Sequence, residues 1–496
     1  MTVHGVGALK RHAIDAYMKD LSSTLSYGYD YHFRAKPQAS MTDMSLSRCT
    51  ETEYEVNVTV HNLTAYREDF KLYISRPDEQ GQGGGVLLSS TRPSNVPVFD
   101  PGFAQVFDGI RLDIDDLLAP FTSRELPNPM VFHDMMHDTL GPATKALSTS
   151  NNADTIKGLS DISGEIKLLT GGITDLNGRF IHEFKARFLE NIEDVIVAYY
   201  CTACTLGAAL AGEQGLWEKT ASVVDEAVAR ASNALQEYSD KSGMSWKEIA
   251  NVLGVVEAGV GLFASTASLF IAPTVALGAS GLVAGLSFVT KTGNFIEDTK
   301  PTQSFASLMK AFAQDLQNIT TNIHDEEKLL HDNLSAWMLG ATQPEWNLDN
   351  QFAGTAIDQR HSWDGVNLEL PKFQDMYQST LPHISSDLRA VKQKIELLTD
   401  NSMWYRDPRL GVSYRGCWSQ WDQLRWELTR LLGDLQTETD RAAKVLQDAD
   451  SAFRHNDESA AAKLKKLRRT IDAGTGYSAD DPNPDRFLND HWLNHV

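Results

Sequence analysis

The fold class is decided by one region of the chain, which reads FIHEFKARFLENIEDVIVAYY (residues 180–200) and, further on, GLWEKTASVVDEAVARASNALQEY (residues 215–238). Apolar side chains recur in both stretches at spacings of three and four, which places them on one face of an α-helix. Gly207, Gly212 and Gly215 lie in the middle and are expected to interrupt or bend this helix. Residues 303–339 repeat the apolar pattern. The patterns predict a mainly α protein, an elongated bundle of long amphipathic helices.

The carboxyl-terminal region predicts a helical hairpin. A second helix begins near Trp418, and residues 401–417, with Pro408 and two glycines, form the turn before it. The helix before the turn carries a heptad repeat, which keeps one apolar stripe facing a partner helix. This partner-helix seam consists of Tyr377, Leu381, Ile384, Leu388, Val391, Ile395 and Leu398.

A change of period near the amino end predicts a small β-rich module. Tyr54, Val56, Val58 and Val60 alternate with polar residues, as in a half-buried strand. Further short strands are expected at FKLYISRP (70–77), VLLSS (86–90), VPVFD (96–100) and IRLDI (110–114). The predicted order is an amino-terminal helix and linker (1–44), the β-rich module (45–118), long helices (119–340) around a hydrophobic hairpin (252–290), a loop (341–371), the carboxyl-terminal hairpin (372–472) and a polar tail (473–496).

The central hairpin is predicted from an uncharged segment, Ala258–Thr290, which has no charged side chain over 33 positions. One helix of that length would measure about 50 Å, more than the roughly 30 Å core of a bilayer, so Pro273 is taken as the turn between two helices. Three interpretations stay open: a buried core hairpin sheathed by the amphipathic helices, a hairpin stored in a soluble form and released into a membrane, and a constitutive anchor. The membrane-insertion candidates are Leu262, Phe263, Leu269, Phe270, Ile271, Pro273, Val275, Leu277, Leu282, Val283, Leu286 and Phe288.

The composition narrows the function classes. The chain has 496 residues with 45 Lys+Arg and 66 Asp+Glu, so its formal net charge is −21. Nucleic-acid binding needs a clustered basic surface, so no nucleic-acid partner is expected. Hydrophobic residues make up 42%, enough for a sizeable core, and four cysteines are too few for a disulfide scaffold. The amino terminus contains no apolar core of a conventional signal peptide.

No motif predicts catalysis. His133 and His137 have the i, i+4 spacing of a zinc-binding helix, but Asp134 stands where a zincin has Glu and no clear third ligand follows, which favours a helical surface. Cys201 and Cys204 have redox spacing within an apolar run, which favours buried thiols. The glycine-rich loop at 81–85 lacks the Lys-Ser/Thr ending of a phosphate-binding loop. We expect no enzyme, cofactor or metal; a zinc hydrolase at the two histidines is the alternative.

Several features together resemble the large helical proteins that actinobacterial type VII (ESX) secretion systems export, in the WXG superfamily. The resemblance covers roughly residues 100–340 and 415–470: paired long helices (175–220), a Gly/Ala-rich hydrophobic insert (246–287), the helix that follows it (306–334) and a final helix (440–467). The family's Tyr-x-x-x-Asp/Glu export signal corresponds to FRHND, which makes Phe453 and Asp457 the export-signal candidates. The resemblance implies secretion without a conventional signal peptide.

A second resemblance, in architecture, is to α-helical pore-forming toxins, which combine long helices with a concealed hydrophobic hairpin. Two functional hypotheses follow. The first is a non-enzymatic exported interaction or effector protein that binds protein partners through helical seams. The alternative is a pore-forming toxin or toxin component whose hairpin inserts into a lipid membrane after a trigger. An oligomer is compatible with both.

Overall fold

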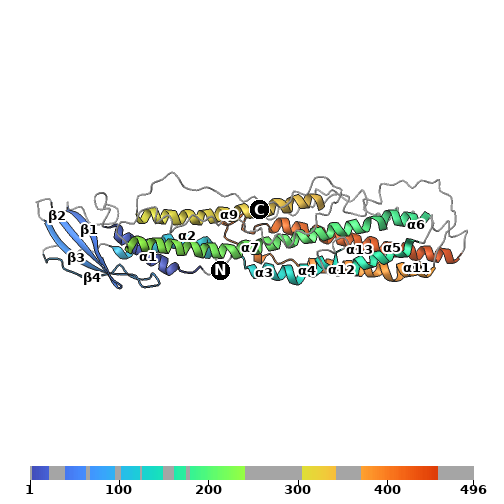
Figure 1. The fold of residues 1–496 in the computed structure, drawn as a ribbon, viewed down its shortest axis with the longest axis horizontal. Coiled ribbons are helices and arrows are strands. Elements are labelled where there is room, and N and C mark those ends of the chain that lie inside the picture. Colours follow the sequence, from blue (N-terminus) through green and yellow to red (C-terminus); the bar gives the residue numbers. More distant parts are fainter. Residues whose placement is uncertain are drawn as a thin grey trace.

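The computed structural model describes residues 3–21, 40–62, 67–94, 102–122, 126–148, 161–174, 179–240, 304–341 and 370–455. Long helices run along one axis of an elongated molecule, and a small sheet lies at one end (Figure 1). The prediction of a mainly α protein with a small β module near the amino terminus is confirmed. The helices are α1 (Val6–Asp20), α2 (Phe103–Thr122), α3 (Pro129–Asp134), α4 (Gly141–Ala146), α5 (Asp161–Thr174), α6 (Arg179–Phe184), α7 (Glu190–Asp240), α9 (Phe305–Ala341), α11 (Leu370–Asp375), α12 (Leu381–Glu396) and α13 (Trp418–His455).

Short π-helical segments join some of these helices into longer rods. They lie at Met135–Leu140, Lys185–Leu189 and Met376–Thr380, so that α3 continues into α4, α6 into α7 and α11 into α12. A 3₁₀ turn occupies Ser402–Trp404.

The central helix of the bundle is α7, which at 51 residues is about 75 Å long. It continues through the three glycines that were expected to interrupt it. Gly207 and Gly212 are buried, and a Cβ added at Gly207 would lie 3.6 Å from Leu140 Cδ2. Packing of the helix in the bundle therefore outweighs the weak helix propensity of glycine, which costs about 1 kcal/mol for each residue relative to alanine.

α9 and α13 both lie antiparallel along α7. Near the carboxyl end of α9, Trp337 Nε1 donates to Thr202 Oγ1 over 3.3 Å, whereas the amino end of α9 meets the carboxyl end of α7. In α13, Trp421 Nε1 donates to the carbonyl of Leu206 over 3.0 Å. Along α9 the buried apolar stripe is Leu308, Phe312, Leu316, Ile319, Ile323, Leu330 and Leu334.

The predicted seam lies between helices of the same chain. All seven of its residues are buried, and α12 packs along α13 and against α5. The residues between α12 and α13 form the turn of a hairpin, with Gly411 and Gly416 at positive φ.

The sheet has four antiparallel strands in the order β1 (Ser40–Cys49), β2 (Glu53–Asn62), β3 (Arg67–Ser75) and β4 (Leu87–Ser90). Val56 of β2 pairs with Leu46 of β1 and with Leu72 of β3. One face is apolar and buried, as the alternation in β2 predicts, and the ring of Tyr54 packs edge-to-face on Phe107 of α2 with centroids 6.1 Å apart.

The predicted strand at 110–114 is wrong, because these residues lie in the middle of α2. Five residues of alternating polarity fit a strand, but the wider sequence has apolar side chains at helical spacings from Phe103 to Phe121. The exposure of the side chains also fits a helix and not the predicted strand, since Arg111 is buried whereas Leu112 is 61% exposed. The sheet begins at Ser40, five residues before the predicted module.

Several predicted segments lie outside the described residues. These are the hydrophobic hairpin (252–290), the strand at 96–100, nearly all of the loop (341–371) and the polar tail (473–496).

Candidate functional site

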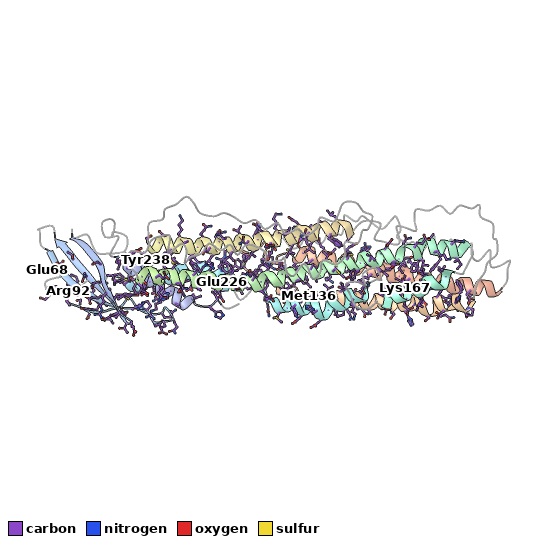
Figure 2. The ribbon with its side chains drawn as sticks, viewed as in Figure 1. Glu68, Arg92, Met136, Lys167, Glu226 and Tyr238 are labelled. Carbon is purple, nitrogen blue, oxygen red and sulfur yellow. The ribbon has the colours of Figure 1, made fainter. Side chains whose placement is uncertain are left out.

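The ends of α7 and α9 meet beside the sheet. These two helices flank residues 241–303, which contain the uncharged segment. Because α7 and α9 are antiparallel, the chain leaves α7 and enters α9 at the same end of the bundle (Figure 1). Tyr238, in the last turn of α7, lies at the end of the bundle nearest the sheet, and Glu68 of β3 lies further out at the same end (Figure 2).

The carboxylate of Asp20, at the end of α1, binds both of these helix ends. One of its oxygens accepts from the hydroxyl of Tyr238, and the other accepts from the N–H of Phe305 over 2.7 Å. The first N–H groups of a helix have no partner within the helix and carry positive partial charge, so Asp20 caps α9 and complements its dipole. We call Asp20, Tyr238 and Phe305 the junction.

Neighbouring residues of α1 reinforce the junction. The ring of Tyr17 packs edge-to-face on Phe305, with centroids 5.9 Å apart. The ammonium group of Lys19 lies 4.8 Å from the centre of the Tyr238 ring and donates to the Tyr238 carbonyl. Burial, followed by the hydrogen bond to Asp20, raises the pKa of Tyr238, so its hydroxyl stays protonated and donates at physiological pH.

α1 and the residues just before it lie along the last third of α7. The backbone N–H of His4 donates to Asp225 over 2.8 Å, and the Nδ1 atom of His12 lies 3.1 Å from the carbonyl and 2.9 Å from the Oγ of Ser232. The Nδ1 atom donates to the carbonyl or accepts from the hydroxyl, depending on the tautomer of the ring. Burial lowers the pKa of His12, and the imidazole is therefore neutral at physiological pH.

The opposite side of α1 is attached to the sheet. Asp15 is buried, and its carboxylate accepts from Arg76 Nε over 2.9 Å and from Tyr54 Oη over 2.6 Å. Arg76 also donates to the carbonyl of Thr50 over 3.0 Å. Burial and the adjacent Asp15 raise the pKa of Tyr54. A neutral phenol and a paired guanidinium thus satisfy a carboxylate that would otherwise be unpaired inside the protein.

The glycine-rich loop at residues 81–85 contacts both α1 and α2. Arg111 of α2 donates to the carbonyls of Gly81, over 2.6 Å, and Gly83, and Lys10 of α1 binds Asp115 over 2.6 Å. Gly81 has a φ of +70°, and a Cβ there would lie 2.6 Å from the carbonyl oxygen of Gly7. The loop at 81–85 is therefore a close-packed connection between sheet and helices.

A second buried polar cluster lies in the middle of the bundle. Arg406, in the turn between α12 and α13, binds Glu213 of α7 over 3.2 Å and also pairs with Glu327 of α9; all three side chains are fully buried. Glu213 accepts from Trp217 Nε1 over 2.9 Å, and Glu327 accepts from the N–H of Val412 over 2.9 Å. We call Arg406, Glu213 and Glu327 the triad; it holds α9 and α7 to the hairpin turn.

The predicted site residues fall in different places. All membrane-insertion candidates lie outside the described residues, as does Asp457, and Phe453 lies in the last turn of α13. His133 and His137 lie on α3 and the π-helical segment after it, with ring centroids 4.2 Å apart. Within the described part of the chain, no group of three or more His, Cys, Asp or Glu side chains is placed to hold a metal ion.

The thiols of Cys201 and Cys204, the pair with redox spacing, are half-buried on α7. Burial raises the pKa of Cys201 to about 11 and that of Cys204 to about 12. Both thiols are therefore protonated at neutral pH, which is the unreactive form.

Sequence reasoning missed both the junction and the triad. Asp20 is separated by more than 200 residues from each of its two partners, and nothing local distinguishes it from a solvated carboxylate. A signal did exist for the triad, because Glu327 occupies a position of the apolar stripe of α9, between Ile323 and Leu330. A charge at such a position predicts a buried partner.

The chain matches no protein-family model, no curated protein and no solved structure. Among the described residues, one helix, α7, is long and apolar enough to cross a membrane by length and composition. Its most apolar window is 78% buried, which is expected for the central helix of a bundle.

Proposed function

We propose that this protein acts on membranes: the helical bundle carries the uncharged segment Ala258–Thr290 and inserts it into a lipid bilayer, in the manner of an α-helical pore-forming protein. One observation supports this proposal above all. Along the sequence, the 33 uncharged residues come after α7 and before α9, two long antiparallel helices whose ends are held together beside the sheet.

The length of the segment suits a hairpin in a membrane. Pro273 divides it into Ala258–Ala272 and Thr274–Thr290, which as helices would measure about 22 Å and about 26 Å. Each is somewhat shorter than the roughly 30 Å hydrocarbon core, so insertion involves flanking residues, local thinning or association of several hairpins. Six glycines between positions 254 and 285 favour close packing of helices when several hairpins associate, because glycine has no side chain.

We expect the helical bundle to stay folded while the segment inserts into the membrane. α7 and α9 are bound to each other by the junction at one end and by the triad further along. The junction is partly buried, because Asp20 and Phe305 are half-buried beside the buried Tyr238, whereas the triad is fully buried. The proposal therefore places the movement at the sheet end and the fixed point in the middle of the molecule.

The resemblance to type VII secretion substrates stays a prediction about how the chain is exported. It is compatible with membrane insertion, because an exported protein can act on a membrane afterwards. The proposed action needs no catalytic group.

Release of a trapped dye from liposomes tests the proposal. Purified protein is added to vesicles of anionic and neutral lipid between about pH 4 and pH 8, because acid reduces the −21 charge that opposes approach to anionic lipid. We expect dye release and flotation of the protein with the vesicles. Intact vesicles and no flotation throughout this range would contradict the proposal.

Charge substitutions show whether the segment is responsible. The double variant Leu269→Lys, Leu282→Lys places two charges in it, each costing about 2.5–3.5 kcal/mol at the centre of a bilayer, so insertion should fall by more than about a thousandfold. Leu339→Lys is the matched control, since Leu339 is 70% exposed on α9. Equal leakage by the double variant and the control would assign the activity to another part of the chain.

A further inference from the structure

We propose that His133 and His137 form a two-histidine site for a divalent transition-metal ion such as zinc or copper. This site is independent of the proposed membrane activity and lies on a different part of the bundle. In the sequence, the spacing of the two histidines favours a plain helical surface. The structure adds how the two rings lie and what surrounds them.

The two imidazole rings lie side by side and are open to solvent. Their centroids are 4.2 Å apart, with an angle of 46° between the ring planes. His133 is half-buried and His137 is exposed. Within the described part of the chain, neither ring forms a hydrogen bond or an ion pair. The nitrogens of both rings are therefore available to bind the same ion.

The backbone holds both rings on one side of the helix. The opposite side is anchored in the bundle, since Phe132 packs edge-to-face on Trp404 with centroids 5.2 Å apart and Met136 is buried (Figure 2). In an α-helix, a residue four positions further on lies about 40° from the first. The change to the wider π-helical turn at Met135, between the two histidines, reduces this angle. The pair is thus arranged before any ion binds.

The chemistry of the pair selects the class of ion. Neutral imidazole suits zinc, copper and nickel, whereas magnesium and calcium take oxygen ligands. Asp134 and Asp138, which directly follow the histidines, are exposed and add negative charge that favours a cation.

The described residues supply only two ligands at this place. Zinc in proteins usually has four, and no group of three or more His, Cys, Asp or Glu side chains in the described ranges is placed to hold a metal ion. Water fills the remaining positions, so the bound ion exchanges with solvent and is accessible to other molecules.

Calorimetric titration of the full chain, without an affinity tag, tests the site with zinc, copper and magnesium ions. We expect saturable binding of zinc, tighter binding of copper as the order of divalent metals predicts, and no competition by magnesium. His133→Gln and His137→Gln should each weaken zinc binding by at least about tenfold, because even loss of an outer-shell partner costs about 10–100-fold in metal affinity.

His324→Gln is the matched control. His324 is an exposed histidine of α9 that lies 3.5 Å from Asp325, and the next histidine of α9, His331, is seven residues away. Two turns of helix, about 10 Å, separate these two positions, so they do not bind one ion together. The control should bind zinc as the wild type does. All three variants change surface side chains and should give the same far-UV circular dichroism as the wild type.

Amide hydrogen exchange locates the bound ion. Because the ion joins two successive turns, zinc should increase the protection of residues 133–140 in the wild type and in His324→Gln, but not in His133→Gln or His137→Gln. Zinc binding that both of these variants retain, or that magnesium displaces, would overturn the proposal. So would the absence of saturable zinc binding to the wild type.

Discussion

Replacement of Arg406 by methionine should be among the most destabilising single substitutions in this protein. Arg406, Glu213 and Glu327 are fully buried, so Arg406→Met leaves two carboxylates inside the bundle without a counter-charge. Breaking a buried ion pair by removing one partner costs about 3–5 kcal/mol. The hydrogen bonds from Trp217 and Val412 still stabilise the carboxylates, whereas the stacking of Arg406 on the Trp217 ring, 4.9 Å away, is lost. These effects oppose each other, and we expect a loss of about 4 kcal/mol.

Urea unfolding followed by tryptophan fluorescence measures this loss, because Trp217, Trp404 and Trp421 are buried near the triad. Arg409→Met is the matched control in the same turn: its side chain is 57% exposed and pairs only with Asp407 in the described structure, so it should cost less than about 0.5 kcal/mol.

A triple variant tests the physical reason for the loss. Glu213→Gln, Glu327→Gln, Arg406→Met removes all three charges and should recover most of the stability. A loss below about 1 kcal/mol for Arg406→Met, or no recovery in the triple variant, would refute the explanation by buried charge.

Two further predictions concern the carboxyl-terminal hairpin. Leu388→Ala opens a cavity in the fully buried seam and should cost about 2–5 kcal/mol in thermal unfolding, whereas Leu397→Ala, at a side chain 76% exposed, should cost under about 0.5 kcal/mol; equal losses would show that the seam does not hold the hairpin. If Phe453 and Asp457 form an export signal, Phe453→Ala and Asp457→Ala should each abolish export from a type VII-competent host, as judged by immunoblot of culture medium. Unchanged export would remove these residues as a signal.

The helices could be predicted closely where their apolar faces are regular. The spacing in residues 303–339 predicted α9, which the structure places at Phe305–Ala341. The heptad of α12 likewise predicted a partner helix, because a seam that repeats every 3.5 residues stays buried only against another helix. In both cases local periodicity and tertiary burial agree.

Prediction failed where local pattern and tertiary context differ. Residues 110–114 alternate like a strand, yet α2 buries Arg111 because the carbonyls of Gly81 and Gly83 accept its hydrogen bonds. Those carbonyls belong to a different element, so five residues of sequence contain no information about them. The glycines within α7 are a similar case, since the neighbouring helices keep the helix continuous.

The candidate site was still harder to find in the sequence. The uncharged segment is visible in composition alone, but the junction depends on one carboxylate of α1 reaching α7 and α9. Asp20 lies in a polar stretch, and its role follows only from the antiparallel packing of two distant helices. Arg406 also resembles an ordinary turn residue until Glu213 and Glu327 are placed beside it.

The most direct test of the central claim is the depth of the uncharged segment in a bilayer. An environment-sensitive fluorophore is attached to Leu277→Cys in a chain whose four native cysteines are replaced by serine, and liposomes carrying a quencher at the bilayer centre are added in acid. Leu339→Cys on the exposed side of α9 serves as the control position. We predict a blue shift and strong quenching at position 277 and neither at position 339. An unquenched fluorophore at 277, in vesicles to which the protein has bound, would contradict insertion of the segment.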